Sequence, residues 1–355
     1  MHKRWVFKLS FLFLFFSFSI MALNYIVDPF QHYRIASWYK ITSKKQREVT
    51  PGLAKNFDYQ TVVLGSSMAE NFEASFINKI LDTRSLKLCM SAMTAYEMRS
   101  LLEVILSNNK KLDTVILALD LYAFTGKETR IRTDKQPTYL YDNNPLTDIF
   151  YLLNKETLRF SFRMLSKERG KASDFDKMWY WGNAYNFSKE TVLSTYHKHS
   201  FNSSFKNSEY TKEIFIRNFN YNLLHLIRDN PKVNFIIFYP PYSYLTYKDM
   251  QDKQWLQEAI SFKKYIFDLG LDNLEVYDFQ CLNEVTENLD NYRDITHYSA
   301  DINKLIINAI KNKKHLTTQD NINTCLHQMQ KSANKVTQES SNLKHSKIPL
   351  LKIED

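Results

Sequence analysis

Short apolar segments alternate with longer amphipathic segments along most of this chain. Five short segments are rich in apolar residues, as in strands buried on both faces, and they lie at 61–64, 85–90, 114–119, 234–239 and 274–279. Segments with helical periodicity lie at 70–81, 95–108, 209–228, 248–269 and 299–310. The alternation predicts an α/β protein, with a mostly parallel five-stranded sheet between two layers of helices.

An apolar run precedes the first predicted strand and extends from residue 9 to residue 27. It has about the 20 residues that a helix needs to cross the hydrocarbon core of a membrane. The positive charges lie before it, at Lys3, Arg4 and Lys8, which predicts a cytoplasmic N-terminus and a domain in the periplasm or outside. The alternative is a cleaved signal peptide, but the run is long for one and no A-x-A site follows it. We therefore expect a single-pass anchor in a bacterial inner membrane.

These patterns divide the chain into four parts. Residues 1–27 are the cytoplasmic stub and anchor, 28–56 a juxtamembrane segment, and 57–310 the α/β domain. A polar and aromatic stretch at about 125–208 interrupts the alternation, and we interpret it as a helical insertion over one edge of the sheet. Residues 311–355 are polar and poor in aromatics, which predicts a disordered tail.

Composition narrows the possible partners. The net charge of +9 is spread along the chain without a stripe of interleaved aromatics, so we expect no nucleic-acid partner. The three cysteines have neither metal-ligand spacing nor a C-x-x-C pair, which indicates neither a zinc site nor a disulfide framework. His197 and His199 have no acidic or Cys partner at a diagnostic spacing, so we expect them to face solvent. We expect no metal and no cofactor.

The first motif with candidate chemistry is Gly65-Ser66-Ser67, between a predicted strand and a helix. Open α/β folds bind their ligands at the carboxyl ends of strands, where this hydroxyl would lie. Backbone N–H groups at the following helix start can stabilise an oxyanion there. The alternative is a turn with an ordinary N-cap serine.

The second motif is Asp294-Ile295-Thr296-His297, between the last predicted strand and the last helix of the domain. A carboxylate three residues before an imidazole can accept its Nδ1–H, which leaves Nε2 free to take a proton from a serine. The position after the last strand places this motif at the same edge of the sheet as Ser67.

Together, these two motifs resemble the first and last blocks of the GDSL/SGNH hydrolase family. In that family the nucleophile follows the first strand in Gly-Asp-Ser, and a D-x-x-H block lies near the C-terminus. The resemblance makes Ser67 the nucleophile and His297 and Asp294 its base and acid. It covers about residues 57–310 and looks closest to a membrane-anchored bacterial branch, related to polysaccharide O-acetyl esterases and acetyltransferases, that shares an Asn-Tyr-Ile-Val-Asp-Pro-Phe-like segment, here at 24–30.

Two other family blocks differ here. Ala92 takes the place of a glycine whose backbone N–H joins the oxyanion hole, and alanine suits that role only where φ is not positive. Asp120 lies where the family's Gly-x-Asn-Asp block supplies an amide, and an ionised carboxylate facing an oxyanion would repel it. Two outcomes are open: Asp120 is turned into a hydrogen-bond network with backbone donors, or, as we expect, it faces the pocket and binds substrate hydroxyls. Tyr242 ends a Tyr-Pro-Pro-Tyr segment that either lines a sugar site or forms a rigid turn.

The sequence thus leads to an acyl-ester hydrolase or O-acyltransferase that acts on an envelope glycan or related polymer. A transferase would also need an acyl donor, for which a separate membrane protein is a candidate. The alternative is an inactive scaffold of the same fold that binds polymer or a partner in envelope assembly, which the Asp120 position favours. A secreted lipase fits the anchor less well.

Overall fold

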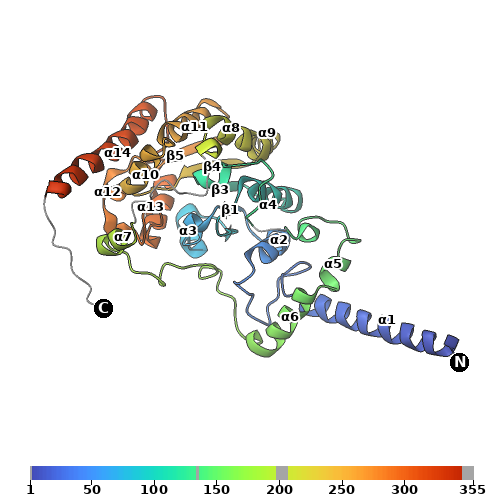
Figure 1. The fold of residues 1–355 in the computed structure, drawn as a ribbon. Helices are drawn as coiled ribbons and strands as arrows, with labels where there is room; N and C mark the ends of the chain where they lie inside the picture. Colours follow the sequence, from blue (N-terminus) through green and yellow to red (C-terminus); the bar gives the residue numbers. More distant parts are fainter. Residues whose placement is uncertain (1, 133–135, 197–206, 346–355) are drawn as a thin grey trace, which may run out of the picture.

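The computed structural model describes residues 2–132, 136–196 and 207–345 (Figure 1). A sheet of five strands, all parallel, forms its centre in the order β2-β1-β3-β4-β5. The strands are β1 (Thr61–Leu64), β2 (Ser85–Lys87), β3 (Thr114–Ala118), β4 (Asn234–Tyr239) and β5 (Leu274–Asp278). This is the doubly wound order of flavodoxin-like folds, so the predicted fold class is confirmed.

The helices cover both faces of the sheet. Right-handed crossovers place α3 (Ala74–Leu81) and α13 (Ala300–Lys311) on one face, where they contact each other. The other face carries α4 (Ala95–Asn108), α8 (Lys212–Phe219), α9 (His225–Asp229) and α11 (Leu256–Asp268). Because helices lie on both sides, every residue of β1 is buried.

The remaining helices lie outside these two layers. They are α1 (His2–Val27), α2 (Gln46–Asn56), α5 (Ile149–Leu152), α6 (Lys155–Arg163), α7 (Lys189–Thr195), α10 (Tyr244–Asp252), α12 (Asn283–Thr286) and α14 (Ile322–His345). Of these, α5, α6 and α7 belong to the predicted insertion, which consists of short helices and long loops. Helices α5 and α6 contact the end of α1 instead of covering an edge of the sheet.

The strand order creates a crevice between β1 and β3. The chain leaves β1 toward β2 and leaves β3 toward β4, so the two connections diverge at the carboxyl ends of these neighbouring strands. Gly65 follows β1 here, and a Cβ on it would lie 2.7 Å from Cβ of Ala118 and 3.0 Å from Cβ of Ala69. Glycine therefore allows the close packing that brings Ser67 and Asp120 to one edge of the sheet.

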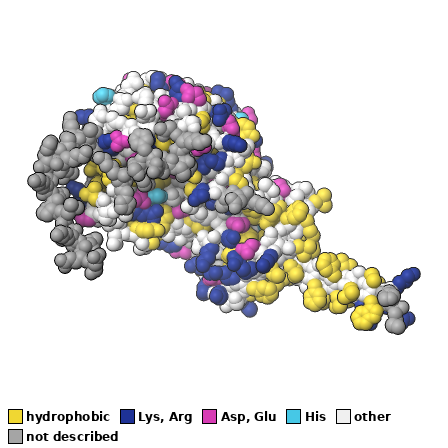
Figure 2. All heavy atoms as spheres, viewed as in Figure 1, with side chains coloured by type: hydrophobic (Ala, Val, Ile, Leu, Met, Phe, Trp, Pro, Cys, Tyr) yellow, Lys and Arg dark blue, Asp and Glu magenta, His cyan; other side chains and the backbone are white. Residues whose placement is uncertain are grey.

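Helix α1 projects from the body of the molecule and is long and apolar enough to cross a membrane, by length and composition. Its apolar side chains are exposed along most of its length (Figure 2). Only its last turns contact other elements, namely α5 and α6.

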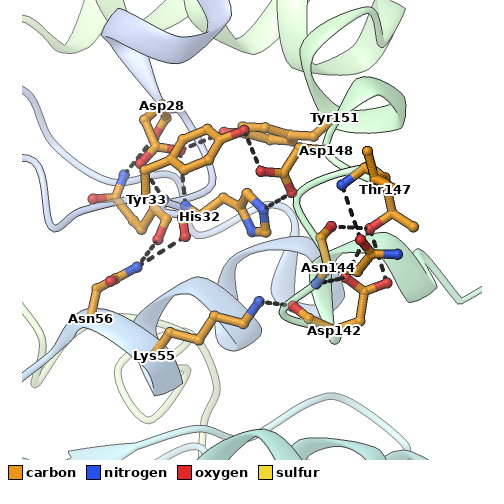
Figure 3. Close-up of polar contacts among 12 residues, drawn as sticks. Asp28, His32, Tyr33, Lys55, Asn56, Asp142, Asn144, Thr147, Asp148 and Tyr151 are labelled. Atoms are coloured by element: carbon orange, nitrogen blue, oxygen red, sulfur yellow. Dashed lines mark hydrogen bonds and ion pairs between the residues drawn. The ribbon is translucent and has the colours of Figure 1, made fainter. Parts of the chain in front are cut away.

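The juxtamembrane segment belongs to the folded body, which therefore begins earlier than the predicted boundary at residue 57. Asp28 accepts hydrogen bonds from the backbone N–H groups of His32, Tyr33 and Arg34 at 2.9, 2.8 and 3.0 Å (Figure 3). Helix α2 buries its central residues. Its Gly52 packs so closely that a Cβ there would lie 2.3 Å from the carbonyl oxygen of Phe30.

The predicted disordered tail differs from the structure over its described part. Helix α14 packs against α10 and α11, and its buried residues Ile322, Leu326, Met329 and Ala333 recur at helical spacing. A disulfide joins Cys281 to Cys325 and fixes the start of α14 beside the end of β5, with the Cα atoms 5.1 Å apart. The cysteine spacing did not indicate this disulfide.

The disulfide predicts a measurable stabilisation of the protein. It closes a loop between residues 44 apart in sequence, so it restricts the unfolded chain. We expect the double substitution Cys281→Ser and Cys325→Ser to lower the free energy of unfolding by about 2–4 kcal/mol. Denaturant titration of the full chain in detergent measures this. A midpoint equal to that of the oxidised native chain would show that α14 needs no covalent attachment.

Candidate active site

Ser67, His297 and Asp294 form a continuous hydrogen-bonded chain at the carboxyl edge of the sheet. The distance between Ser67 Oγ and His297 Nε2 is 2.9 Å, although the two residues are 230 positions apart. The distance between His297 Nδ1 and Asp294 Oδ2 is 2.8 Å. The structure thus brings together the three residues that the sequence motifs selected.

The carboxylate of Asp294 determines the tautomer of His297. Burial by itself would raise the pKa of Asp294, but the hydrogen bond and charge of His297, with the backbone N–H groups of His297 and Thr296, hold it well below its ordinary value. Asp294 is therefore ionised and can only accept, so His297 Nδ1 carries a proton toward it. In the neutral ring Nε2 is then the acceptor for the Ser67 hydroxyl, as a general base requires.

Neighbouring loops hold the segment that carries His297. Ser243, just before α10, and Thr246, in the first turn of α10, both donate their hydroxyls to the carbonyl oxygen of Ile295 at 2.6 Å. The hydroxyl of Tyr298 donates to the carbonyl oxygen of Met68 at 2.9 Å, which ties this segment directly to the turn after Ser67. The Ser67–His297 distance is thus fixed from both sides.

Asp120 lies beside Ser67, and the protein itself supplies donors to both of its oxygens. Ser66 Oγ donates to Oδ2 at 3.0 Å, and the hydroxyl of Tyr242 donates to Oδ1 at 2.6 Å. The backbone N–H of Tyr122 donates to Oδ1 at 3.3 Å. Asp120 also lines the cavity, so its negative charge is partly satisfied while it stays within reach of a ligand.

Tyr242 contributes a permanent donor to this network. Burial, and then the charge of Asp120, raise the pKa of Tyr242 well above its ordinary value. The phenol therefore keeps its proton and its hydrogen bond to Asp120 across the physiological range. Tyr242 also lines the cavity, and its contact with a substrate stays a prediction.

Ala92 adopts the backbone conformation that the sequence analysis regarded as unsuitable for alanine. Its φ is +49°, in the left-handed region, within a turn closed by the N–H of Met93 donating to the carbonyl of Met90 at 3.0 Å. A positive φ at this position of a turn favours glycine, because the Cβ of any other residue is disfavoured sterically there. Within the described residues, the N–H groups of Ser67 and Ala92 both lack an intramolecular acceptor, and both residues line the cavity. They are the candidate oxyanion donors.

Gln46, which was not predicted from the sequence, connects α2 to the site. Its side-chain amide donates to Glu70 Oε1 at 2.6 Å, and its amide oxygen accepts from the N–H of Ser91 at 2.9 Å. Burial raises the pKa of Glu70, which the Gln46 hydrogen bond opposes. One side chain thus supports both the turn after Ser67 and the turn that holds Ala92. Its partners are 24 and 45 positions away, so no local pattern indicates it.

The aromatic insertion supplies a second residue that was not predicted. Trp181 donates its indole N–H to the carbonyl oxygen of Ser67 at 3.2 Å. Its ring meets the ring of His297 edge to face, with the centroids 5.6 Å apart. The guanidinium of Arg293 lies over the Trp181 ring, 4.1 Å from its centroid. Trp181 therefore shields one side of the imidazole.

A cavity of about 490 Å³ opens beside the triad, and this volume suits a small organic ligand. Its far wall is aromatic, because Tyr210 and Trp255 stack with their centroids 3.7 Å apart. Flat aromatic faces next to carboxylates such as Asp120 and Asp249 suit a ligand that carries both C–H faces and hydroxyl groups.

Among the described residues, one cluster of metal-ligand side-chain types lies close together: Asp278, Cys281 and Cys325. Its two sulfurs are joined in the disulfide, so no thiolate is available to bind a metal. His197 and His199 lie outside the described residues. The triad chemistry itself needs no metal or cofactor.

Searches against protein-family models and against curated proteins find no match to this chain.

The left-handed conformation of Ala92 predicts that glycine is the better residue there. We expect Ala92→Gly to raise the free energy of unfolding by about 0.5–1 kcal/mol, because strain relief exceeds the greater chain entropy of glycine. Ala92→Val should lower it instead, because a β-branched residue fits this region worse. Thermal unfolding of the two variants beside the native chain measures both changes. Equal stability of all three would mean that the turn relaxes without cost.

Proposed function

We propose that this chain is a membrane-anchored serine esterase or O-acyltransferase that acts on an acylated envelope glycan or a related polymer. The observation that carries the proposal is the hydrogen-bonded chain Ser67–His297–Asp294, at the crevice where doubly wound folds bind ligands. The same residues carry the resemblance to the GDSL/SGNH hydrolases. The aromatic wall and carboxylates of the cavity favour a sugar-bearing substrate.

In the proposed reaction, Ser67 Oγ attacks the acyl carbonyl carbon while its proton moves to His297 Nε2. Asp294 stabilises the resulting imidazolium through Nδ1. The backbone N–H groups of Ser67 and Ala92 are the groups proposed to bind the oxyanion. Collapse of the intermediate breaks the ester bond, and the leaving alkoxide takes the proton from Nε2. Water or a sugar hydroxyl then attacks the acyl-enzyme by the same route in reverse.

We further propose that α1 anchors the protein in the bacterial inner membrane, with the N-terminus in the cytoplasm and the domain outside. The basic residues before the apolar run support this orientation. The disulfide between Cys281 and Cys325 supports it independently, because disulfides persist in oxidising compartments such as the periplasm. Such a position gives access to envelope polymers and to a membrane protein that supplies the acyl group.

Turnover of esters by matched variants tests the enzyme proposal. We expect the native chain to hydrolyse p-nitrophenyl acetate, and Ser67→Ala or His297→Ala to lower kcat/KM by at least about 10³-fold. Asp294→Asn should cost about 10²–10⁴-fold, because the ring loses the partner that fixes its tautomer. The neighbouring serine is the matched control: Ser66→Ala should stay within about tenfold of the native chain, since among the described residues its hydroxyl bonds only to Asp120 and to the N–H of Met68 and has no contact with His297.

A glycan substrate separates chemistry from recognition in the same assay. Asp120→Asn should weaken turnover of an acetylated polysaccharide and leave that of p-nitrophenyl acetate nearly unchanged, because only the sugar offers hydroxyl groups to a carboxylate. Equal losses on both esters would assign Asp120 to support of the triad. Absence of turnover of either ester by the folded native chain would favour the inactive scaffold.

A further inference from the structure

Exposed apolar side chains gather on the side of the body next to α1. Outside α1, nine large hydrophobic side chains are exposed in the described residues, and five of them lie between positions 146 and 162: Leu146, Ile149, Phe150, Leu153 and Phe162. We call these five residues the α5–α6 patch. Leu146 is 82% exposed, Phe150 62% and Phe162 57%. Such a concentration on one surface indicates contact with an apolar partner.

The patch flanks the end of the apolar helix. Asn24, in the last turn of α1, is buried between α5 and α6: its amide donates to the carbonyl oxygen of Leu152 at 2.8 Å, and its amide oxygen accepts from Ser161 Oγ at 2.8 Å. Asn24 precedes the helix end at Val27 by three residues, a rise of about 5 Å. Helices α5 and α6 therefore lie beside a part of α1 that is itself within the apolar run.

Hydrogen bonds attach α5 rigidly to the segment that follows α1. The carboxylate of Asp148, just before α5, lies 2.9 Å from His32 Nε2 and accepts from the hydroxyl of Tyr33 at 3.0 Å (Figure 3). Tyr151, within α5, donates its hydroxyl to Asp28 at 2.8 Å. Because both groups bind the juxtamembrane segment, the patch keeps a fixed depth relative to α1.

Basic residues accompany the apolar ones. Positions 155–171 contain six Lys or Arg residues and two Glu residues. Figure 2 shows Lys and Arg side chains gathered on the body next to the base of α1, beside apolar surface. Long basic side chains next to an apolar patch are typical of helices that lie in the headgroup region of an anionic bilayer.

We propose that the α5–α6 patch is a second membrane contact, which inserts into the surface of the same anionic phospholipid bilayer that α1 crosses. The inference rests on the proposed anchoring by α1 and goes beyond it, since an anchor alone leaves the domain free to tilt. With two contacts the body has one orientation, and the cavity beside Ser67 keeps a constant direction relative to the membrane.

Depth-dependent quenching in vesicles tests this contact. The full chain is reconstituted into phosphatidylglycerol–phosphatidylcholine vesicles with one introduced cysteine that carries a fluorescent label, at Phe150→Cys or Phe162→Cys. The native cysteines do not compete, because Cys89 is buried and the other two form the disulfide. The matched control is Leu193→Cys, on α7 at 47% exposure, which lies far from α1 in Figure 1. Phe16→Cys, within α1, reports on the anchor.

We expect nitroxide lipids to remove most of the fluorescence at positions 150 and 162, with the strongest effect from nitroxides about 5–10 Å below the headgroups. The label at position 193 should be unaffected. Quenching at position 16 without quenching at 150 and 162 would overturn the second contact and leave the anchor intact. Absence of quenching at position 16 as well would contradict the anchor itself.

Discussion

The carboxylate of Asp294 accepts hydrogen bonds from two backbone N–H groups and from the imidazole three residues later. The backbone bonds, from Thr296 and His297, close a tight turn, and the imidazole bond orients the ring that this turn carries. The shape of the loop and the chemistry of the base therefore depend on one ionised group. Three further interactions place Ser67 Oγ in front of His297 Nε2. They are the close packing at Gly65, the hydrogen bond from Tyr298 to Met68, and the hydrogen bond from the Trp181 indole to the carbonyl oxygen of Ser67.

A continuous series of contacts connects the segment after α1 to the candidate site. Asp28 organises the turn after α1, and α2 packs against this turn through Gly52. Gln46, at the start of α2, then reaches both turns that flank the candidate oxyanion position. A domain joined to its anchor only by a flexible linker would not need these contacts. The arrangement supports the proposed function, in which the substrate is presented at a fixed distance from the membrane.

The parts of the fold that the sequence predicted are those with strong local patterns. Strands β1 and β4 match their predicted bounds because both are apolar at nearly every position. Helix α4 matches because Thr94 and Glu97 form a capping box before an amphipathic run. Helix α14 was not predicted because its composition is mostly polar, although its apolar residues Ile322, Leu326 and Met329 recur at helical spacing. The disulfide was not predicted for the same reason, because helix α14 is the element that holds Cys325 beside Cys281.

Only the site residues that belong to a short sequence motif could be predicted. Ser67, Asp294 and His297 belong to two short blocks, whereas Gln46 and Trp181 reach the site from distant segments that carry no chemical signature. The left-handed φ of Ala92 is likewise set by tertiary contacts, because Gln46 and Arg47 hold the Ser91 backbone in this turn. The proposed function depends most on the reactivity of the Ser67 hydroxyl.

Covalent labelling of the folded chain with a fluorophosphonate, followed by peptide mass mapping, tests this reactivity most directly. The probe reacts with a serine whose proton an adjacent base removes, so it requires no knowledge of the natural substrate. We predict one adduct, located on Ser67, which disappears in Ser67→Ala and persists in Ser66→Ala. A folded native chain that stays unlabelled, or an adduct that survives Ser67→Ala, would contradict this prediction.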